Sequence, residues 1–187
     1  MPRYDLKRYG RVRASNKRPL KVIQQWELAA NVANGFMTSW RLGSLWDNTS
    51  TARAAYSTTS QPAFAALGDS MSYDNNGRWT FPHTGLYKIS WKMYMSKMTT
   101  DSDDANVNTY GYTGSYYLLT KQPDWIEDEG YTKALSGEYI FDVDTSTKRW
   151  MIYSTGFGTS NYINGAGTVN FRPSYVMFER IGDSPNA

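Results

Sequence analysis

Cysteine is absent from the 187 residues of this sequence, and there is a single histidine. Without cysteine the chain has no disulfide, no thiolate nucleophile and no cysteine ligands for structural zinc. A Ser-His-Asp triad would have to use His83, which lies in the turn-like stretch 82–85. A turn or surface position explains this histidine better than catalysis does. We therefore expect no metal, no cofactor and no enzymatic activity.

Long apolar runs are also missing. The first twenty residues lack the apolar core of about 7–15 residues that a secretory signal needs. No run of about 18 apolar residues, long enough to cross a membrane, occurs anywhere. We therefore expect a protein made in the cytoplasm, without a signal peptide, that does not act at a membrane.

Two acidic clusters and two glycine-rich stretches are weak candidates for ligand sites. Oxygen ligands suit calcium and paired carboxylates could suggest glycoside hydrolysis, but neither acidic cluster has the spacing of a metal-binding loop, and solvated loops explain both better. The glycine-rich stretches 156–158 and 165–167 precede no helical pattern, which argues against a phosphate-binding loop. The acidic clusters consist of Asp101, Asp103 and Asp104, and of Asp124, Glu127, Asp128 and Glu129.

Aromatic residues are abundant: 7 Trp, 15 Tyr and 7 Phe. Tyrosine and tryptophan combine a large apolar body with a polar tip, which suits sheets and interfaces. We expect most of them to fill a sandwich and a subunit interface. As an alternative, three aromatic residues expected in loops could stack on the sugars of a host surface: Trp125, Tyr131 and Tyr162.

Positive charge is concentrated at the N-terminus. Residues 1–21 hold eight basic side chains and one acidic one, a net charge of +7, whereas the other 166 residues hold 12 basic and 16 acidic ones, or −4. We expect residues 1–20 to form an extended arm and residues 21–187 to form one domain. The basic residues, which we expect to bind an acidic partner, are Arg3, Lys7, Arg8, Arg11, Arg13, Lys17, Arg18 and Lys21.

Short strands separated by turns are the pattern beyond residue 20. Strands are expected at 21–28, 36–46, 71–73, 78–81, 86–95, 110–120, 137–143, 149–155 and 169–181, with loops at 99–108, 124–130 and 156–167. Residues 47–62 are rich in Thr, Ser and Ala and predict a long loop or an edge segment, with helix as the competing interpretation for 51–56. The pattern predicts an all-β sandwich or jelly roll.

The stretch 69–98 carries the sharpest pattern. Asn76-Gly77 is a strong signal for a hairpin turn. The following run 86–95 alternates, with Leu86, Lys88, Ser90 and Lys92 on one side and large apolar residues on the other. One face of this strand is therefore expected to be buried: Tyr87, Ile89, Trp91, Met93 and Met95.

The residues Trp79, Phe81, Gly85, Leu86, Tyr87 and Trp91 resemble the signature of the complement/tumour-necrosis-factor-like jelly roll. In that signature an aromatic-x-aromatic strand and a proline turn precede a Gly-Leu-Tyr that opens a core strand. Residues 136–153 resemble the paired penultimate strands of the family, and residues 168–181 resemble its last strand. Gly85 would permit a tight approach of the chain before the strand, and Tyr87 would supply a large inward ring.

The resemblance implies an antiparallel sandwich of about ten strands that associates as a homotrimer. Related jelly rolls occur in tailed bacteriophages, which points to a virion structural protein. We therefore expect a capsid decoration or cement protein, or a head fibre, whose arm binds an acidic surface of the major capsid protein or of another virion protein. Two alternatives stay open: a fibre-tip module that recognises host glycans, and a capsid subunit whose arm binds nucleic acid.

Overall fold

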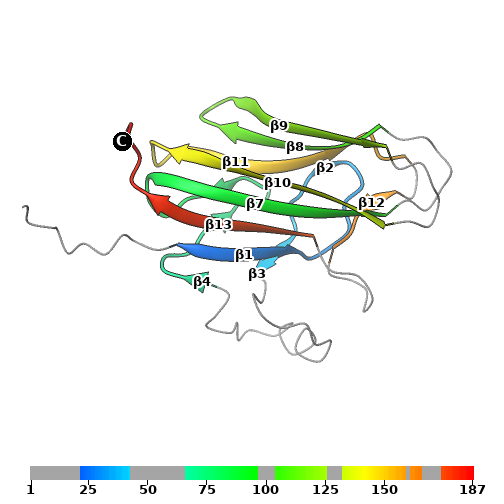
Figure 1. Cartoon of the computed structure of the whole chain (residues 1–187), viewed down its shortest axis with the longest axis horizontal. Helices are drawn as coiled ribbons and strands as arrows, with labels where there is room; N and C mark the ends of the chain where they lie inside the picture. The colour runs from blue at the N-terminus through cyan, green and yellow to red at the C-terminus, as the bar shows by residue number, and fades with distance from the viewer. Residues whose placement is uncertain (1–21, 43–65, 97–103, 126–131, 159–160, 166–173) are drawn as a thin grey trace, which may run out of the picture.

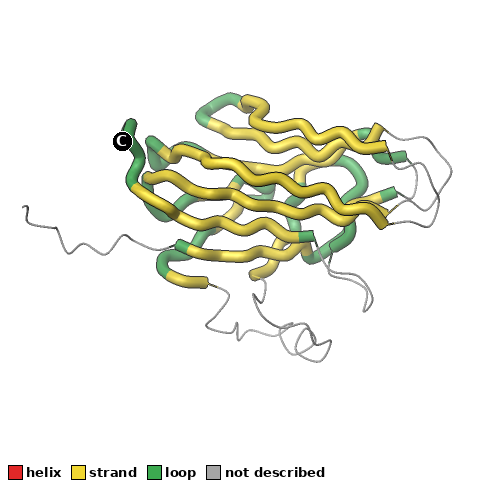
Figure 2. Tube along the Cα trace, in the orientation of Figure 1, coloured by secondary structure: helices red, strands yellow, loops and turns green. Residues whose placement is uncertain are grey.

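Two antiparallel β-sheets packed face to face form the described part of the chain in the computed structural model (Figure 1). The structure describes residues 22–42, 66–96, 104–125, 132–158, 161–165 and 174–187. Within these ranges the chain contains strands, turns and loops but no helix (Figure 2). The basic arm, Tyr131 and the stretch 51–56 lie outside the described residues.

The first sheet has seven strands and its central path runs β10-β7-β13-β1-β3, with β12 added to β7 and β4 added to β1. Figure 1 shows β10, β7, β13 and β1 side by side in this order. The strands are β1 (Ile23–Leu28), β3 (Trp40–Leu42), β4 (Ala66–Leu67), β7 (Gly85–Ser96), β10 (Thr132–Val143), β12 (Tyr162–Ile163) and β13 (Tyr175–Gly182).

The second sheet has six strands and its central path runs β5-β6-β11-β8-β9, with β2 added to β11. Every strand pair in both sheets is antiparallel in the part of the chain that the structure describes. The strands are β2 (Gly35–Phe36), β5 (Ser72–Tyr73), β6 (Trp79–Thr80), β8 (Asp104–Tyr112), β9 (Tyr116–Trp125) and β11 (Arg149–Thr155). This confirms the all-β jelly-roll sandwich that the sequence predicts.

The core lies between the sheets and is rich in aromatic rings. Strand β7 supplies one side of it, and the expected inward residues Tyr87, Ile89, Trp91, Met93 and Met95 are all buried. Trp79 from β6 and Trp150 from β11 contribute from the other sheet, each in ring contact with Phe178 of β13. The alternation of β7 therefore fixes which face of the first sheet packs against the second.

The Asn-Gly turn closes the short hairpin of β5 and β6, as expected. Gly77 has a φ of +74°, and a Cβ there would lie 2.7 Å from the carbonyl oxygen of Met37. The Asp74 carboxylate accepts hydrogen bonds from the backbone N–H groups of Asn76 and Arg78. Only glycine fits this position without strain or collision.

Gly85 permits the close approach that the sequence suggests at the start of β7. Its φ is +149°, and a Cβ would lie 2.6 Å from both the Arg180 Nε and the carbonyl oxygen of Gly182. The Arg180 guanidinium donates to the carbonyl oxygen of Thr84 at 3.1 and 3.0 Å. The first residues of β7 are thus held directly against the end of β13.

The strand expected at 110–120 is wrong. The chain turns back at residues 113–115, where Gly114 has a φ of +103°, and this turn joins β8 to β9. Residues typical of strands, mostly tyrosine and leucine, stand on both sides of this short turn and hid it in the sequence. Because β8 begins at Asp104 and β9 ends at Trp125, the expected loops at 99–108 and 124–130 are also partly strand.

Three further expectations need correction. The segments 136–143 and 149–153 do not pair with each other, because the turn between them crosses from one sheet to the other: β10 pairs with β7, and β11 pairs with β8. Within the expected loop 156–167, residues 162–163 form β12. Strand β10 begins at Thr132 rather than at residue 137, because its backbone pairing with β7 continues past the alternating stretch. Residues 169–173 of the expected last strand lie outside the described part, and β13 runs over Tyr175–Gly182.

Candidate functional site

Each sheet ends in a long strand that has a partner on one side only. β9 pairs with β8 and β10 pairs with β7, and nothing in the described part of the chain pairs with their other sides. These strands contain 10 and 12 residues, and Figure 1 shows β9 uppermost in its sheet and β10 beside β7 in the other. We call the free sides of β9 and β10 the open edge. Unpaired backbone N–H and C=O groups along such strands are ready to pair with another chain.

Aromatic and aliphatic side chains fill the gap between the two sheets at the open edge. Leu119, Leu135 and Tyr139 are partly buried and pack against the core. The Tyr117 ring lies over Gly111, where a Cβ would lie 2.1 Å from the ring. The absence of a side chain at residue 111 therefore lets a large ring cover the end of the core while part of it stays exposed.

Tyr139 anchors β10 to the second sheet. Its hydroxyl accepts a hydrogen bond from the Trp150 indole N–H, and Thr109 is a further hydrogen-bond partner. Burial raises the pKa of Tyr139, so the hydroxyl stays protonated at neutral pH. Burial also raises the pKa of Tyr117, and the nearby Asp144 carboxylate adds to this effect. The open edge therefore presents neutral aromatic groups.

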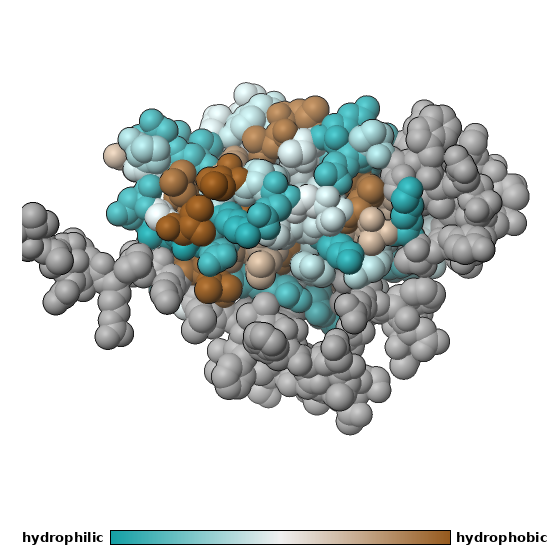
Figure 3. Space-filling model, viewed as in Figure 1, coloured by the Kyte–Doolittle hydropathy of each residue, from teal (hydrophilic) through white to brown (hydrophobic). Residues whose placement is uncertain are grey.

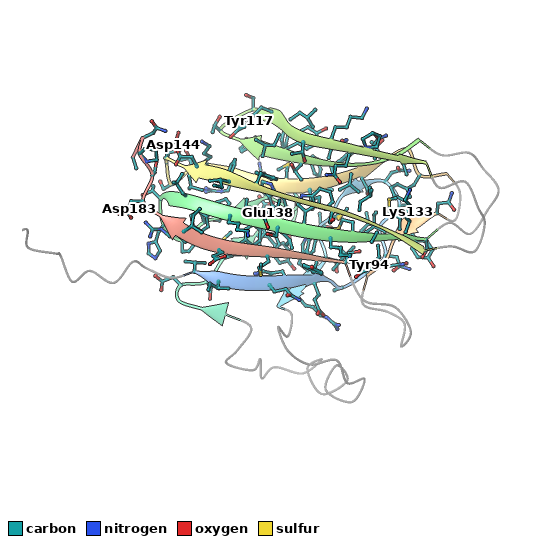
Figure 4. The ribbon with its side chains drawn as sticks, viewed as in Figure 1. Tyr94, Tyr117, Lys133, Glu138, Asp144 and Asp183 are labelled. Carbon is teal, nitrogen blue, oxygen red and sulfur yellow. The ribbon has the colours of Figure 1, made fainter. Side chains whose placement is uncertain are left out.

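The outward side of the first sheet forms a broad surface, which we call the seven-strand face. Ile140 of β10, Lys88 of β7 and Glu179 of β13 lie in one row across it. The next row contains Glu138, Ser90 and Met177. Figure 4 shows Glu138 near the middle of the sheet, with Tyr94 and Lys133 toward one end of the strands and Asp144 and Asp183 at the other.

Charge in the centre of the seven-strand face is locally balanced. The Glu138 Oε2 lies 3.0 Å from Lys88 Nζ and accepts a hydrogen bond from Ser90 Oγ, also at 3.0 Å. These two hydrogen bonds hold the pKa of the Glu138 carboxyl below its usual value. At the side of the sheet, Arg41 and Glu27 form a looser pair at 3.4 Å.

An apolar patch interrupts the charged centre toward one end. Ile140 is 62% exposed and Ile181 is 45% exposed, and both point outward from strands that flank β7. Figure 3 shows hydrophobic surface gathered on this face toward the C-terminus. Side chains of this kind next to unpaired edges are typical of contact surfaces between proteins.

The outward side of the second sheet carries a different group of side chains, which we call the tyrosine face. Five rings from four strands gather on this side of the sheet. Met151, which stands opposite Tyr110 and points away from the main core, is fully buried among the side chains of this face. Successive ring centroids lie 4.9–6.3 Å apart. The rings belong to Phe36, Tyr110, Tyr112, Tyr116 and Tyr153.

The hairpin between β5 and β6 completes the tyrosine face. The Arg78 guanidinium lies over the Tyr112 ring at 5.1 Å, and its Nε is 2.6 Å from the Asp74 Oδ2. Partial burial acts to raise the pKa of Asp74, but hydrogen bonds from Arg78 and Asn76 outweigh it and lower that pKa. The sequence analysis missed this face because its rings come from four strands that only the sheet order brings together.

The structure places the predicted fold-signature residues together but not the predicted glycan residues. Trp79, Phe81, Tyr87 and Trp91 are all buried in the core. Tyr162 lies half-buried in β12 rather than in a loop, because its backbone pairs with Ser96. Trp125 is the last residue of β9, and its side chain, like Tyr131 and the arm residues, lies outside the described part.

His83 lies in the turn before β7, as expected. Its Nε2 contacts the Asp69 carboxylate, and its carbonyl oxygen accepts a hydrogen bond from the Tyr87 hydroxyl at 3.0 Å. Among the described residues, no three acidic, histidine or cysteine side chains gather where they could hold a metal ion. None of the described elements is a helix with the length and hydropathy needed to cross a membrane.

Comparison with solved structures identifies the fold. Eiger TNF from S. frugiperda superimposes with a TM-score of 0.58 over 89% of this chain and 96% of that one, at 12% sequence identity. Murine APRIL superimposes with a TM-score of 0.56 over 86% of this chain and 99% of that one, at 6% identity. No protein-family model and no curated protein matches the sequence. The chain therefore has a TNF-like jelly-roll fold.

Proposed function

We propose that this chain is a non-catalytic structural subunit of a virion, a homotrimer that decorates or stabilises the particle. Its body self-associates through the open edge and the seven-strand face. Its basic arm fastens the trimer to an acidic surface of the major capsid protein or of another virion protein. The single observation that carries the proposal is the pair of long, uncovered edge strands beside an exposed apolar patch.

Self-association would cover the unpaired backbone of the edge strands and the exposed apolar patch. Edge strands of 10 and 12 residues are much longer than natural proteins normally leave open. In this arrangement the open edge of one subunit contacts the seven-strand face of the next. Because the two surfaces differ, the contact is head-to-tail, and such contacts close into a ring when the rotation between neighbouring subunits is a whole fraction of a turn. The jelly-roll family that the sequence resembles forms such rings of three.

The arm supports attachment to a second partner. Eight basic side chains in residues 1–21 oppose a body with a net charge of −4. A segment of this charge binds acidic protein surfaces with electrostatic steering, and the binding weakens as salt increases. Eight charges are modest for packaging a genome, which favours protein docking over nucleic-acid binding.

Deletion of residues 1–20 tests whether the arm attaches the protein to the particle while the body forms the oligomer. The truncated chain should keep the same oligomeric mass by light scattering but should no longer sediment with particles. A matched control replaces the basic residues of the arm by glutamine and should lose attachment to the same extent. Attachment that survives both changes contradicts the proposal. Retention of DNA or RNA by the full chain, lost with the arm, would assign the arm to the genome instead.

A further inference from the structure

The tyrosine face differs from an ordinary solvated sheet surface in having a buried layer of its own. Met151 is fully buried beneath the five rings, while Tyr116 at the outer end is 50% exposed. Tyr116 stacks on Phe36 with an interplanar angle of 26° and a centroid distance of 5.7 Å. One face of the Tyr116 ring is therefore fixed by the protein and the remainder is offered to solvent in a set position.

Polar groups with hydrogen-bonding capacity accompany these rings. Asn108 lies on the same side of β8 as Tyr110 and Tyr112, because side chains alternate along a strand. It is 6% exposed, and its carboxamide oxygen has no hydrogen-bond partner. Buried amide oxygens normally have a partner. A donor reaching this position between the rings would satisfy it.

Positive charge borders the tyrosine face. Lys121 stands opposite Asn108 in the β8–β9 pair and is exposed. Arg149 stands opposite Tyr112, and its Nη1 donates to the carbonyl oxygens of Ser146 and Lys148. Asp74 is the acid paired with Arg78, so among the described residues Lys121 and Arg149 give this face an excess of positive charge.

We propose that the tyrosine face binds an acidic oligosaccharide, with one sugar ring packed on Tyr116. A carboxylate or sulfate of that unit would face Arg149, which lies in the same row, and one of a neighbouring unit would face Lys121, in the row of Asn108. Tyrosine hydroxyls and the Asn108 amide match the hydroxyl groups of a sugar, and the cations match its charge. This goes beyond the proposed assembly function. Tyr116 and Lys121 belong to β9, whose free backbone edge the proposed assembly covers, but their side chains lie on the outward side of the second sheet, on the layer opposite the seven-strand face.

Single-stranded nucleic acid fits the same surface less well. Successive bases need several free ring faces for stacking, whereas here most rings are covered by their neighbours. Tyr110 and Tyr153 meet edge to face at 85°, and Phe36 and Tyr153 meet at 68°. One exposed ring with a border of hydroxyls and amides suits a single sugar unit better than a run of bases.

A binding assay with the full chain tests the proposal. The probes are sialylated, uronic-acid and sulfated oligosaccharides, their neutral counterparts, and a single-stranded oligothymidine, measured by saturation-transfer NMR and by titration. We expect binding of at least one acidic sugar in preference to its neutral counterpart. Tyr116→Ala and Lys121→Ala should each weaken it by about 3- to 10-fold.

Matched variants separate recognition from folding. Tyr116→Phe keeps the stacking ring and should lose less affinity than Tyr116→Ala, while Lys133→Ala removes an exposed lysine from β10 and should bind normally. Thermal unfolding and oligomeric mass are measured on the same samples. The proposal fails if no acidic sugar binds, if neutral sugars bind equally well, if neither variant weakens binding, or if the oligothymidine binds more tightly through the same residues. Sugar binding by a chain that stays monomeric would remove the proposed assembly but not this site.

Discussion

The seven-strand face and the tyrosine face both carry apolar side chains on the outside of a sheet, but they shield them differently. On the tyrosine face, five rings enclose Met151 so completely that none of it is exposed. On the seven-strand face, Ile140 and Ile181 stay 62% and 45% exposed, and no ring of the described residues covers them. Both faces keep an exposed aliphatic group, since Leu118 beside Tyr110 on the tyrosine face is 53% exposed. The tyrosine face differs in having a fully buried methionine beneath its surface, whereas the isoleucines of the seven-strand face are left to be covered by a second chain.

The largest expected effect comes from Ile140→Asp on the seven-strand face. A carboxylate buried in a subunit contact, close to Glu138, should weaken association by on the order of 1,000-fold, or about 4 kcal/mol. Sedimentation equilibrium measures the change. Tyr116→Asp on the tyrosine face is the matched control and should leave the oligomer intact. Equal loss of association in both variants would erase the distinction between the faces.

The next effect concerns the layer under the tyrosine face. Met151→Ala leaves a cavity beneath the five rings and should lower the free energy of unfolding by about 3 kcal/mol. Association should be unchanged once the protein is folded. Chemical denaturation and light scattering together check this. A loss below about 0.5 kcal/mol would mean that the rings are a loose surface rather than a packed layer.

Two glycines with positive φ, one in each sheet, differ in how closely their surroundings pack. Gly85→Ala places a methyl group against Arg180 and Gly182 at a positive φ, and should cost about 2–3 kcal/mol of unfolding free energy. Gly114→Ala, in the β8–β9 turn, has a positive φ but nothing within 4 Å, and should cost about 1 kcal/mol. Thermal unfolding ranks the two variants, and the reverse order would contradict the close packing at Gly85.

The smallest effect is a pH dependence on the seven-strand face. The folded pKa of Glu138 lies below its unfolded value of 4.5, so its contribution to stability is present above that pH and is lost as pH falls through the folded pKa. Glu138→Gln should therefore lower the stability slightly near neutrality and remove this acidic slope, so that the two proteins converge below the folded pKa. An unchanged acidic limb in denaturation curves from pH 2 to 6 would show that the Lys88 and Ser90 hydrogen bonds do not persist in solution.

The sequence predicts those parts of the fold that are marked by a pattern of neighbouring residues within one strand or turn. The alternation in β7, the Asn-Gly turn and the Gly85 approach are all read from neighbouring residues, and the structure confirms them. The β8–β9 hairpin was missed because its turn, Thr113-Gly114-Ser115, is short and has tyrosines directly on both sides, so the stretch looked like one strand. The pairing of 136–143 with 149–153 was wrong, since sequence neighbours that lie in opposite sheets leave no local signal.

The surfaces that we propose to be functional could not be predicted from the sequence. Exposed tyrosines were expected in loops, and Tyr162 turned out to be half-buried in a short strand. The ring cluster instead combines Phe36, Tyr112 and Tyr153, which are far apart in the sequence and meet through sheet order alone. In the same way, nothing in the residues of β9 or β10 reveals that each ends its sheet. The arm is the opposite case, because its charge is visible in the sequence alone.

The mass of the folded chain in solution tests the central claim most directly. Light scattering coupled to size exclusion, at micromolar concentration and physiological salt, should give three times the 21.3 kDa of one chain. The open edge and the seven-strand face would then be covered by neighbouring subunits. A monodisperse species of 21.3 kDa under these conditions would contradict the account, because both long edge strands would be stable without a partner.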